Sequence, residues 1–367
     1  MIKLIKHIVL KGKVVTFFLF VILSLSSLDS RADHLAGADI TWVCQGGGDF
    51  VIKLRVIRDC NGAAISSVSE TIQVWNHSTI TNITVNYLTD YEGSPSCSIS
   101  GGNLPILCAV GGTGSFQIYE YVSNPINIGG VPPAAGWIFT WDDVYRSTAS
   151  SNLNSPNSFG MTAISKMFTN GGANVSPCYD SSPQFSPEID VLFCDGPNKF
   201  HLRASDPDGD SLVYSFANPL SHMTALQPVF ASPSSIPFAA GYSVSSPMPS
   251  AAQNASNVPG DLDATTGQMS FTSLTQGVFS IRVKVESYRC GVKLAENNCE
   301  LPITVFPCGF VNNEPSISPL LPFGSGPFVF YDTVYAGQVV NFNVVASDFE
   351  LLQDGVTPQQ NTLTAIG

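Results

Sequence analysis

Three carboxylates fall at alternate positions within five residues of the sequence, at Asp206, Asp208 and Asp210. Carboxylate oxygens at this density suit a hard cation, and calcium is the usual one outside cells. A bare turn is the alternative, because Asp-Pro-Asp-Gly is also a favourable type I turn. A turn alone explains Pro207 and Gly209, but it leaves three neighbouring negative charges that repel one another unless a cation or solvent screens them. The stretch therefore predicts a cation site.

Strands are expected on both sides of this acidic turn, because apolar residues alternate with other residues before and after it. The alternating positions are Phe200, Leu202 and Ala204 before the turn and Leu212, Tyr214 and Phe216 after it. A period of two places one set of side chains on one face of a strand. The pattern predicts two strands that hold the carboxylates between them.

The composition favours an extracellular, all-β protein. The chain has 367 residues, enough for two or three domains, and only 12% of them are charged, with a formal net charge of -12. Gly and Pro, which favour turns, are abundant, whereas Lys and Arg are scarce. Nucleic-acid binding needs basic patches, so this balance argues against a nucleic-acid partner.

The N-terminus has the features of an export signal. Four lysines precede an apolar core at residues 14–25, which is short for a membrane span. Small residues before position 33 suit a signal peptidase, and we expect cleavage after Ala32. An uncleaved membrane anchor is the alternative. No other stretch is long and apolar enough to span a bilayer, so we expect no stable membrane span after cleavage and a location at or beyond the outer cell surface.

Nine cysteines follow the signal, and disulfides are the usual state of cysteines in exported chains. Close spacing in the sequence suggests three pairs, Cys97–Cys108, Cys178–Cys194 and Cys290–Cys299. The pairing of Cys44, Cys60 and Cys308 stays open. The odd count leaves one thiol free or paired with something outside this chain.

The strand pattern predicts an all-β fold of antiparallel sandwiches strung end to end. The expected units are residues 33–179, 180–308 and 309–367, after the signal at 1–32. The third unit repeats the second, because residues 342–348 and 200–206 share the pattern F-x-x-x-A-S-D. A sandwich domain needs about 100 residues, so we expect the third unit to be the start of a repeat that a longer protein completes.

Motifs in the second unit resemble those of cadherin-like and dystroglycan-type immunoglobulin-like domains. The order D-x-D-G-D-x-L-x-Y, D-x-x-T-G and G-x-F occurs at residues 206–214, 263–267 and 277–279. The first unit resembles the N-terminal region of gliding motility-associated surface proteins, and residues 37–42 and 58–62 carry this resemblance. Those proteins are adhesin-like and exported by the type IX system. These resemblances imply a modular, calcium-stiffened surface protein.

The cadherin-like resemblance also implies where calcium is bound, namely at the junctions between units. An N/D-x-P linker and a D-x-D turn of the following unit would supply the ligands. The candidate residues are Asp180, Asp206, Asp208 and Asp210 for the first junction, and Asn313, Glu314, Asp348 and Glu350 for the second. Backbone carbonyls and water would complete each shell of six to eight oxygens.

The expected function is therefore non-enzymatic adhesion at the cell surface, with cell-surface glycans or proteins as partners. The chain has no GxSxG or HExxH motif. The alternative is a secreted carbohydrate-active or proteolytic enzyme whose catalytic part lies outside this chain. A purely structural stalk is a third interpretation, close to the first.

We predict that the mature protein begins near Asp33, because the apolar core fits a cleaved signal better than a membrane span. Mass spectrometry of secreted and surface fractions should find no peptide that precedes residue 33. Recovery of the intact N-terminus from the cytosol would contradict the prediction.

Overall fold

The predicted all-β class is confirmed by the computed structural model. It describes residues 34–93, 107–170, 180–185, 192–202, 204–225 and 227–306, and two short strands at 316–317 and 346–347. In these residues the only helix is a single 3-10 turn, Pro156–Ser158, and no helix has the length and apolar character to cross a membrane.

Eight strands form a closed ring of hydrogen-bonded neighbours. In order around the ring they are β1 (Leu35–Gly46), β2 (Asp49–Asp59), β5 (Phe116–Val122), β4 (Asn82–Glu92), β3 (Ser69–Trp75), β7 (Trp137–Asp143), β8 (Met161–Met167) and β17 (Val292–Phe306), which pairs again with β1. The two-residue strand β6 (Ile126–Asn127) pairs with the start of β2. The hairpin between β1 and β2 turns at Gly46, Gly47 and Gly48, all of which have positive φ, a conformation that glycine adopts without strain.

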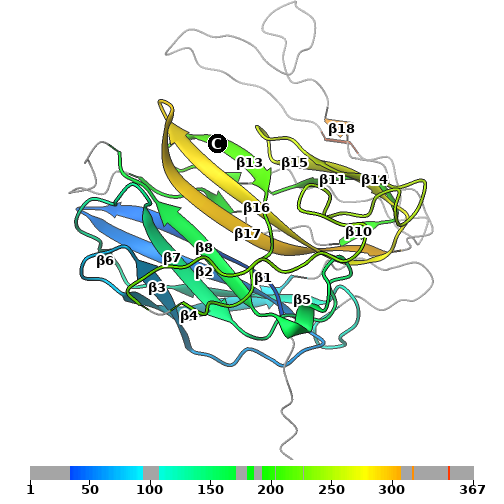
Figure 1. Ribbon diagram of the computed structural model, residues 1–367, viewed down its shortest axis with the longest axis horizontal. Coiled ribbons are helices and arrows are strands. Elements are labelled where there is room, and N and C mark those ends of the chain that lie inside the picture. The colour runs from blue at the N-terminus through cyan, green and yellow to red at the C-terminus, as the bar shows by residue number, and fades with distance from the viewer. Residues whose placement is uncertain are drawn as a thin grey trace, which may run out of the picture.

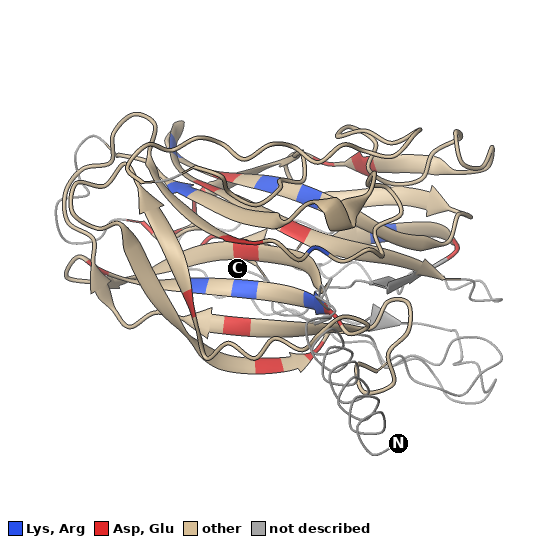
Figure 2. Ribbon diagram, turned by 60° about the horizontal axis from the view of Figure 1, so that its bottom comes forward, with Lys and Arg blue, Asp and Glu red and all other residues tan. Residues whose placement is uncertain are grey.

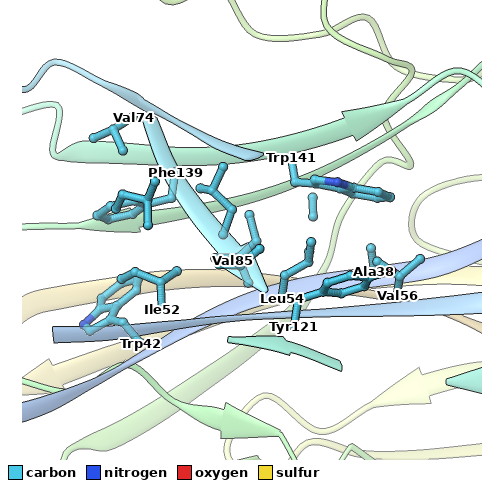
Figure 3. Close-up of a cluster of buried hydrophobic side chains, with 14 of the residues drawn as sticks. Ala38, Trp42, Ile52, Leu54, Val56, Val74, Val85, Tyr121, Phe139 and Trp141 are labelled. Atoms are coloured by element: carbon cyan, nitrogen blue, oxygen red, sulfur yellow. The ribbon is translucent and has the colours of Figure 1, made fainter. Parts of the chain in front are cut away.

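Alternate residues of these strands point into the ring and form the first core. Figure 3 shows side chains from β1, β2 and β5 facing side chains from β3, β4 and β7. The labelled residues are Ala38, Trp42, Ile52, Leu54, Val56, Val74, Val85, Tyr121, Phe139 and Trp141, and all are buried. Burial of this apolar surface from both sides is what stabilises the ring.

β17 is the strand that joins the two halves of the chain, namely residues 34–170, which supply the other ring strands, and residues 180–306. One of its edges pairs with β16 (Gly277–Arg289), which pairs in turn with β13 (Ser211–Phe216). The other edge pairs in succession with β8, with β1 and with β10 (Leu192–Cys194). In Figure 1, β16 and β17 run between the ring strands and the strands of the second unit. The predicted boundary at residue 180 therefore does not separate two sheets, and tandem immunoglobulin-like domains are not confirmed.

A smaller, three-stranded sheet completes the second core. Its order is β11 (Gly196–His201), β15 (Gln268–Ser273) and β14 (Val258–Leu262). Phe200 and Phe271 of this sheet belong to one buried cluster with Ile281 of β16. Ile57 and Ile118 of the ring belong to the same cluster. The second core is therefore built from both halves of the chain.

The predicted internal repeat has a counterpart in two short strand pairs. β9 (Gln184–Phe185) pairs with β12 (Ala204–Ser205), and β18 (Ser316–Ile317) pairs with β19 (Ala346–Ser347). In each pair the first strand follows a proline in the sequence and the second precedes an aspartate. The register is also the same, because Gln184 pairs with Ser205 as Ser316 pairs with Ser347.

The predicted pair Cys97–Cys108 is wrong, because Cys108 forms its disulfide with Cys60. Cys60 follows the end of β2, and its backbone N–H donates to the carbonyl of Ser115, next to β5. Since β2 and β5 are neighbours in the ring, residues 48 positions apart come within a Cα–Cα distance of 5.0 Å. Pairing of strands, and not spacing in the sequence, selected the partner. Cys44 is also disulfide-bonded.

The predicted pair Cys290–Cys299 is also wrong, because both thiols are free. Cys290 is exposed in the turn between β16 and β17, whereas Cys299 is buried opposite Val283 in the body of the sheet. Seven residues of extended strand, 292–298, lie between this turn and Cys299, so the two sulfurs are more than about 20 Å apart. Cys178 lies outside the described residues, so the pair Cys178–Cys194 stays a prediction.

We predict that Val283→Ala on β16 lowers the free energy of unfolding by about 2 kcal/mol, because it removes two methyl groups from the second core. Val283 is 1% exposed. Val213→Ala on the neighbouring β13 is the matched control, since that side chain is 39% exposed, and it should cost less than about 1 kcal/mol. Urea denaturation of the two variants measures the difference. Equal losses would contradict the placement of these strands.

Candidate cation site

The acidic turn between β12 (Ala204–Ser205) and β13 is held by hydrogen bonds between its backbone and the carboxylate of Asp206. Asp206 Oδ1 accepts hydrogen bonds from the backbone N–H groups of Asp208 at 2.9 Å and of Asp210 at 3.2 Å. Gly209 has a φ of +78° and donates its N–H to the carbonyl of Asp206. One oxygen of Asp206 is thus used by the turn, as the bare-turn interpretation requires. The other oxygen, Oδ2, is buried and has no hydrogen-bond partner.

Asp180 reaches the turn from the segment that links the two halves of the chain. Ser182 fixes this segment on β1, because it exchanges backbone and side-chain hydrogen bonds with Trp42 at 2.9 Å and 3.0 Å. The backbone N–H of Ser181 donates to Asp208 Oδ2. These contacts carry Asp180 into the cluster, where its side chain has no exposed surface. The structure thus brings together all four aspartates predicted for the first junction.

Arg289, at the end of β16, is the residue of this site that sequence reasoning missed. Ser211 pairs with Tyr288, so the following residue, Arg289, lies opposite Asp210. Its Nε donates to Asp210 Oδ1 at 2.7 Å and its Nη2 to Asp210 Oδ2 at 2.9 Å. The same Nη2 donates to Asp180 Oδ1 at 3.0 Å. A guanidinium therefore supplies part of the positive charge that three neighbouring carboxylates require.

The carboxyl group of Asp180 carries the strongest electrostatic perturbation in the cluster. Burial, contact with the carboxyl group of Asp210 and the charges of Asp206 and Asp210 raise the pKa of Asp180 to about 9, although Arg289 acts in the opposite direction. Burial likewise raises the pKa of Asp206. Asp180 Oδ2 and Asp206 Oδ2 are both buried without a hydrogen-bond donor. Such oxygens favour either a proton or a bound cation.

The donor set fits a hard cation in its chemistry, because every side-chain candidate is a carboxylate oxygen. The aspartates are not drawn together as closely as Cys60, Glu92 and Cys108, whose ligand atoms lie within 4.8 Å of one another in the described part of the chain. The two sulfurs of that second group form a disulfide, so they offer no thiolate to a metal. The acidic cluster is therefore the better candidate, with Arg289 among its carboxylates. Asn313, Glu314, Asp348 and Glu350, predicted for the second junction, lie outside the described residues.

We predict that, with a chelator present, the free energy of unfolding falls as the pH rises from about 4 to 9. In this window folded Asp180 retains a proton that the unfolded chain has lost, so each unit of pH lowers stability by at most about 1.4 kcal/mol through this group. Asp180→Asn should flatten the dependence, whereas Asp261→Asn, an exposed aspartate of β14, should not. Urea denaturation of wild type and both variants at pH 5, 7 and 9 measures how the free energy of unfolding depends on pH. The same slope in wild type and Asp180→Asn would contradict the assignment.

Comparison with family models, with curated proteins and with solved structures gives no match to this chain. The resemblance to cadherin-like domains and to gliding motility-associated surface proteins thus stays a prediction from motifs.

Proposed function

We propose that the chain is a non-enzymatic, adhesin-like protein of the extracellular space or outer cell surface, stiffened by calcium at the acidic cluster. The observation that supports the calcium site is the pair of buried carboxylate oxygens, Asp180 Oδ2 and Asp206 Oδ2, that no hydrogen-bond donor satisfies. Calcium would supply positive charge and accept oxygen ligands from Asp180, Asp206, Asp208 and Asp210.

Three separate segments of the chain meet at these carboxylates. Asp180 belongs to the segment fixed on β1, residues 206–210 form the turn before β13, and Arg289 ends β16. Neutralising the carboxylates would lower the repulsion between segments that belong to the ring and to the second core. Binding would therefore make the joint between the two cores more rigid, a property that suits a protein under mechanical load at a surface.

The surface location is supported by covalent chemistry. The Cys60–Cys108 disulfide links the residue after β2 to the segment before β5, and such bonds persist in oxidising compartments. The motifs shared with adhesin-like proteins lie in both halves of the chain. Glycans or proteins of other cell surfaces are the proposed partners.

We predict that the chain from Asp33 to Gly367 binds calcium at millimolar concentration, with measurable heat and a higher melting temperature. Asp180→Asn and Asp206→Asn, which keep side-chain shape and remove a charge, should each weaken binding at least about tenfold, since a carboxylate–calcium contact is worth more than about 1.4 kcal/mol. Isothermal titration and thermal denaturation monitor both effects.

Asp261→Asn is the matched control, because it removes the same charge from an exposed position on β14. A wild-type chain without calcium-dependent heat or thermal shift at millimolar calcium would refute the calcium site and leave a turn closed by Arg289.

Adhesion is measured as binding of the same chain to glycan arrays and to whole cells, with calcium and with chelator. Absence of binding in both conditions would contradict the adhesive role.

A further inference from the structure

We propose that Arg289 is a built-in counter-ion that competes with calcium for the acidic cluster and so sets the affinity of the cluster for the ion. This inference rests on the proposed function, since it concerns the same site. It adds a residue that no carboxylate motif includes.

The contacts of Arg289 place it on the carboxylates that calcium would need. Its guanidinium holds both oxygens of Asp210, at 2.7 Å and 2.9 Å, and one oxygen of Asp180, at 3.0 Å. A further nitrogen–oxygen distance, to Asp208, is 3.9 Å. Only the second oxygen of Asp180 and that of Asp206 stay buried without a donor. Arg289 thus occupies one part of the cluster and leaves the other part unsatisfied.

Calcium and this guanidinium cannot both be well accommodated. Calcium requires six to eight oxygen ligands, and both oxygens of Asp210 already accept hydrogen bonds from the fork of Arg289. A guanidinium within a few ångströms of a divalent cation also repels it. Binding of the ion therefore requires that Arg289 leave Asp210, and the energy lost with those two hydrogen bonds lowers the affinity.

Arg289 is placed so that it can leave. Its side chain is 31% exposed, and it ends β16 beside the tight turn at Cys290 and Gly291, which have φ values of 50° and 80°. By contrast, Arg55 and Arg282 are 6% and 3% exposed and are held within the sheets. Arg289 is not a member of either buried core. The ion would then take over the role of the guanidinium in balancing the carboxylates.

A counter-ion of this kind gives weak, switchable binding. Extracellular calcium modules have dissociation constants of about 10⁻⁴–10⁻³ M, and competition by Arg289 would keep this cluster in that range. The fold would stay closed by Arg289 at low calcium, as during export, and exchange the arginine for the ion outside.

The test is isothermal titration of calcium into the chain from Asp33 to Gly367 with Arg289→Gln. We expect the variant to bind calcium at least about tenfold more tightly than wild type and to melt at a lower temperature in chelator. Lys284→Gln is the matched control, because it removes the same charge from the same strand and its ion pair is with Glu286. It should leave calcium affinity unchanged.

Arg289→Lys is a second variant that tests the inference if Arg289→Gln does not fold. Lysine retains the charge but cannot hold Asp210 through two parallel hydrogen bonds, so the calcium affinity of Arg289→Lys should lie above that of wild type.

A second readout is a fluorescent maleimide on Cys290, the exposed thiol beside Arg289, with Cys290→Ser as the labelling control. Calcium should change its emission in wild type.

The outcomes separate the inference from the proposed function. If wild type and Arg289→Gln bind calcium equally, or the variant binds more weakly, Arg289 is not a competitor and the inference is wrong while the calcium site stands. If none of the variants binds calcium, the proposed calcium function itself fails. Tighter binding by both Arg289 variants, with no change in Lys284→Gln, supports the competition.

Discussion

β17 pairs with other strands along both of its edges, and the two cores are held together through it. Along one edge it takes β16, and along the other it takes β8, β1 and β10 in succession. A strand with no free edge has its backbone groups satisfied within the sheet and can be buried on both faces. Residues 294–305 of β17 are almost all buried, and they contribute to the core of the ring and to the second core. The two halves of the chain therefore form one hydrogen-bonded body.

Burial of β17 also buries a charge, Glu300, and the fold depends on satisfying it. Glu300 pairs with Arg146 and accepts a hydrogen bond from Ser280 at 2.8 Å. Arg146 donates in addition to the carbonyls of Gly160 and Leu220, so it fastens two loops to the sheet. A buried ion pair contributes little net stability, but the loss of one partner is costly because the other charge stays buried. The geometry of these loops is thus specified by charge pairing.

The acidic cluster lies at another place where the two halves of the chain are joined. Its contacts reach β1 through Ser182, the turn before β13 through Asp206, and the hairpin of β16 and β17 through Arg289. Positively and negatively charged residues also occur on many other strands (Figure 2). Four carboxyl groups and one guanidinium are thus concentrated where segments of the two cores meet.

Local alternation and turn chemistry were sufficient to predict the all-β class, the acidic turn and the repeat in 342–348. Folding in three dimensions was needed to reveal the partner of Cys108, the free state of Cys290 and Cys299, and the place of Arg289 beside Asp210. Each of these follows from which strands are neighbours and in which register. Register is set by long-range packing of two cores through β17, and no spacing along the chain encodes it.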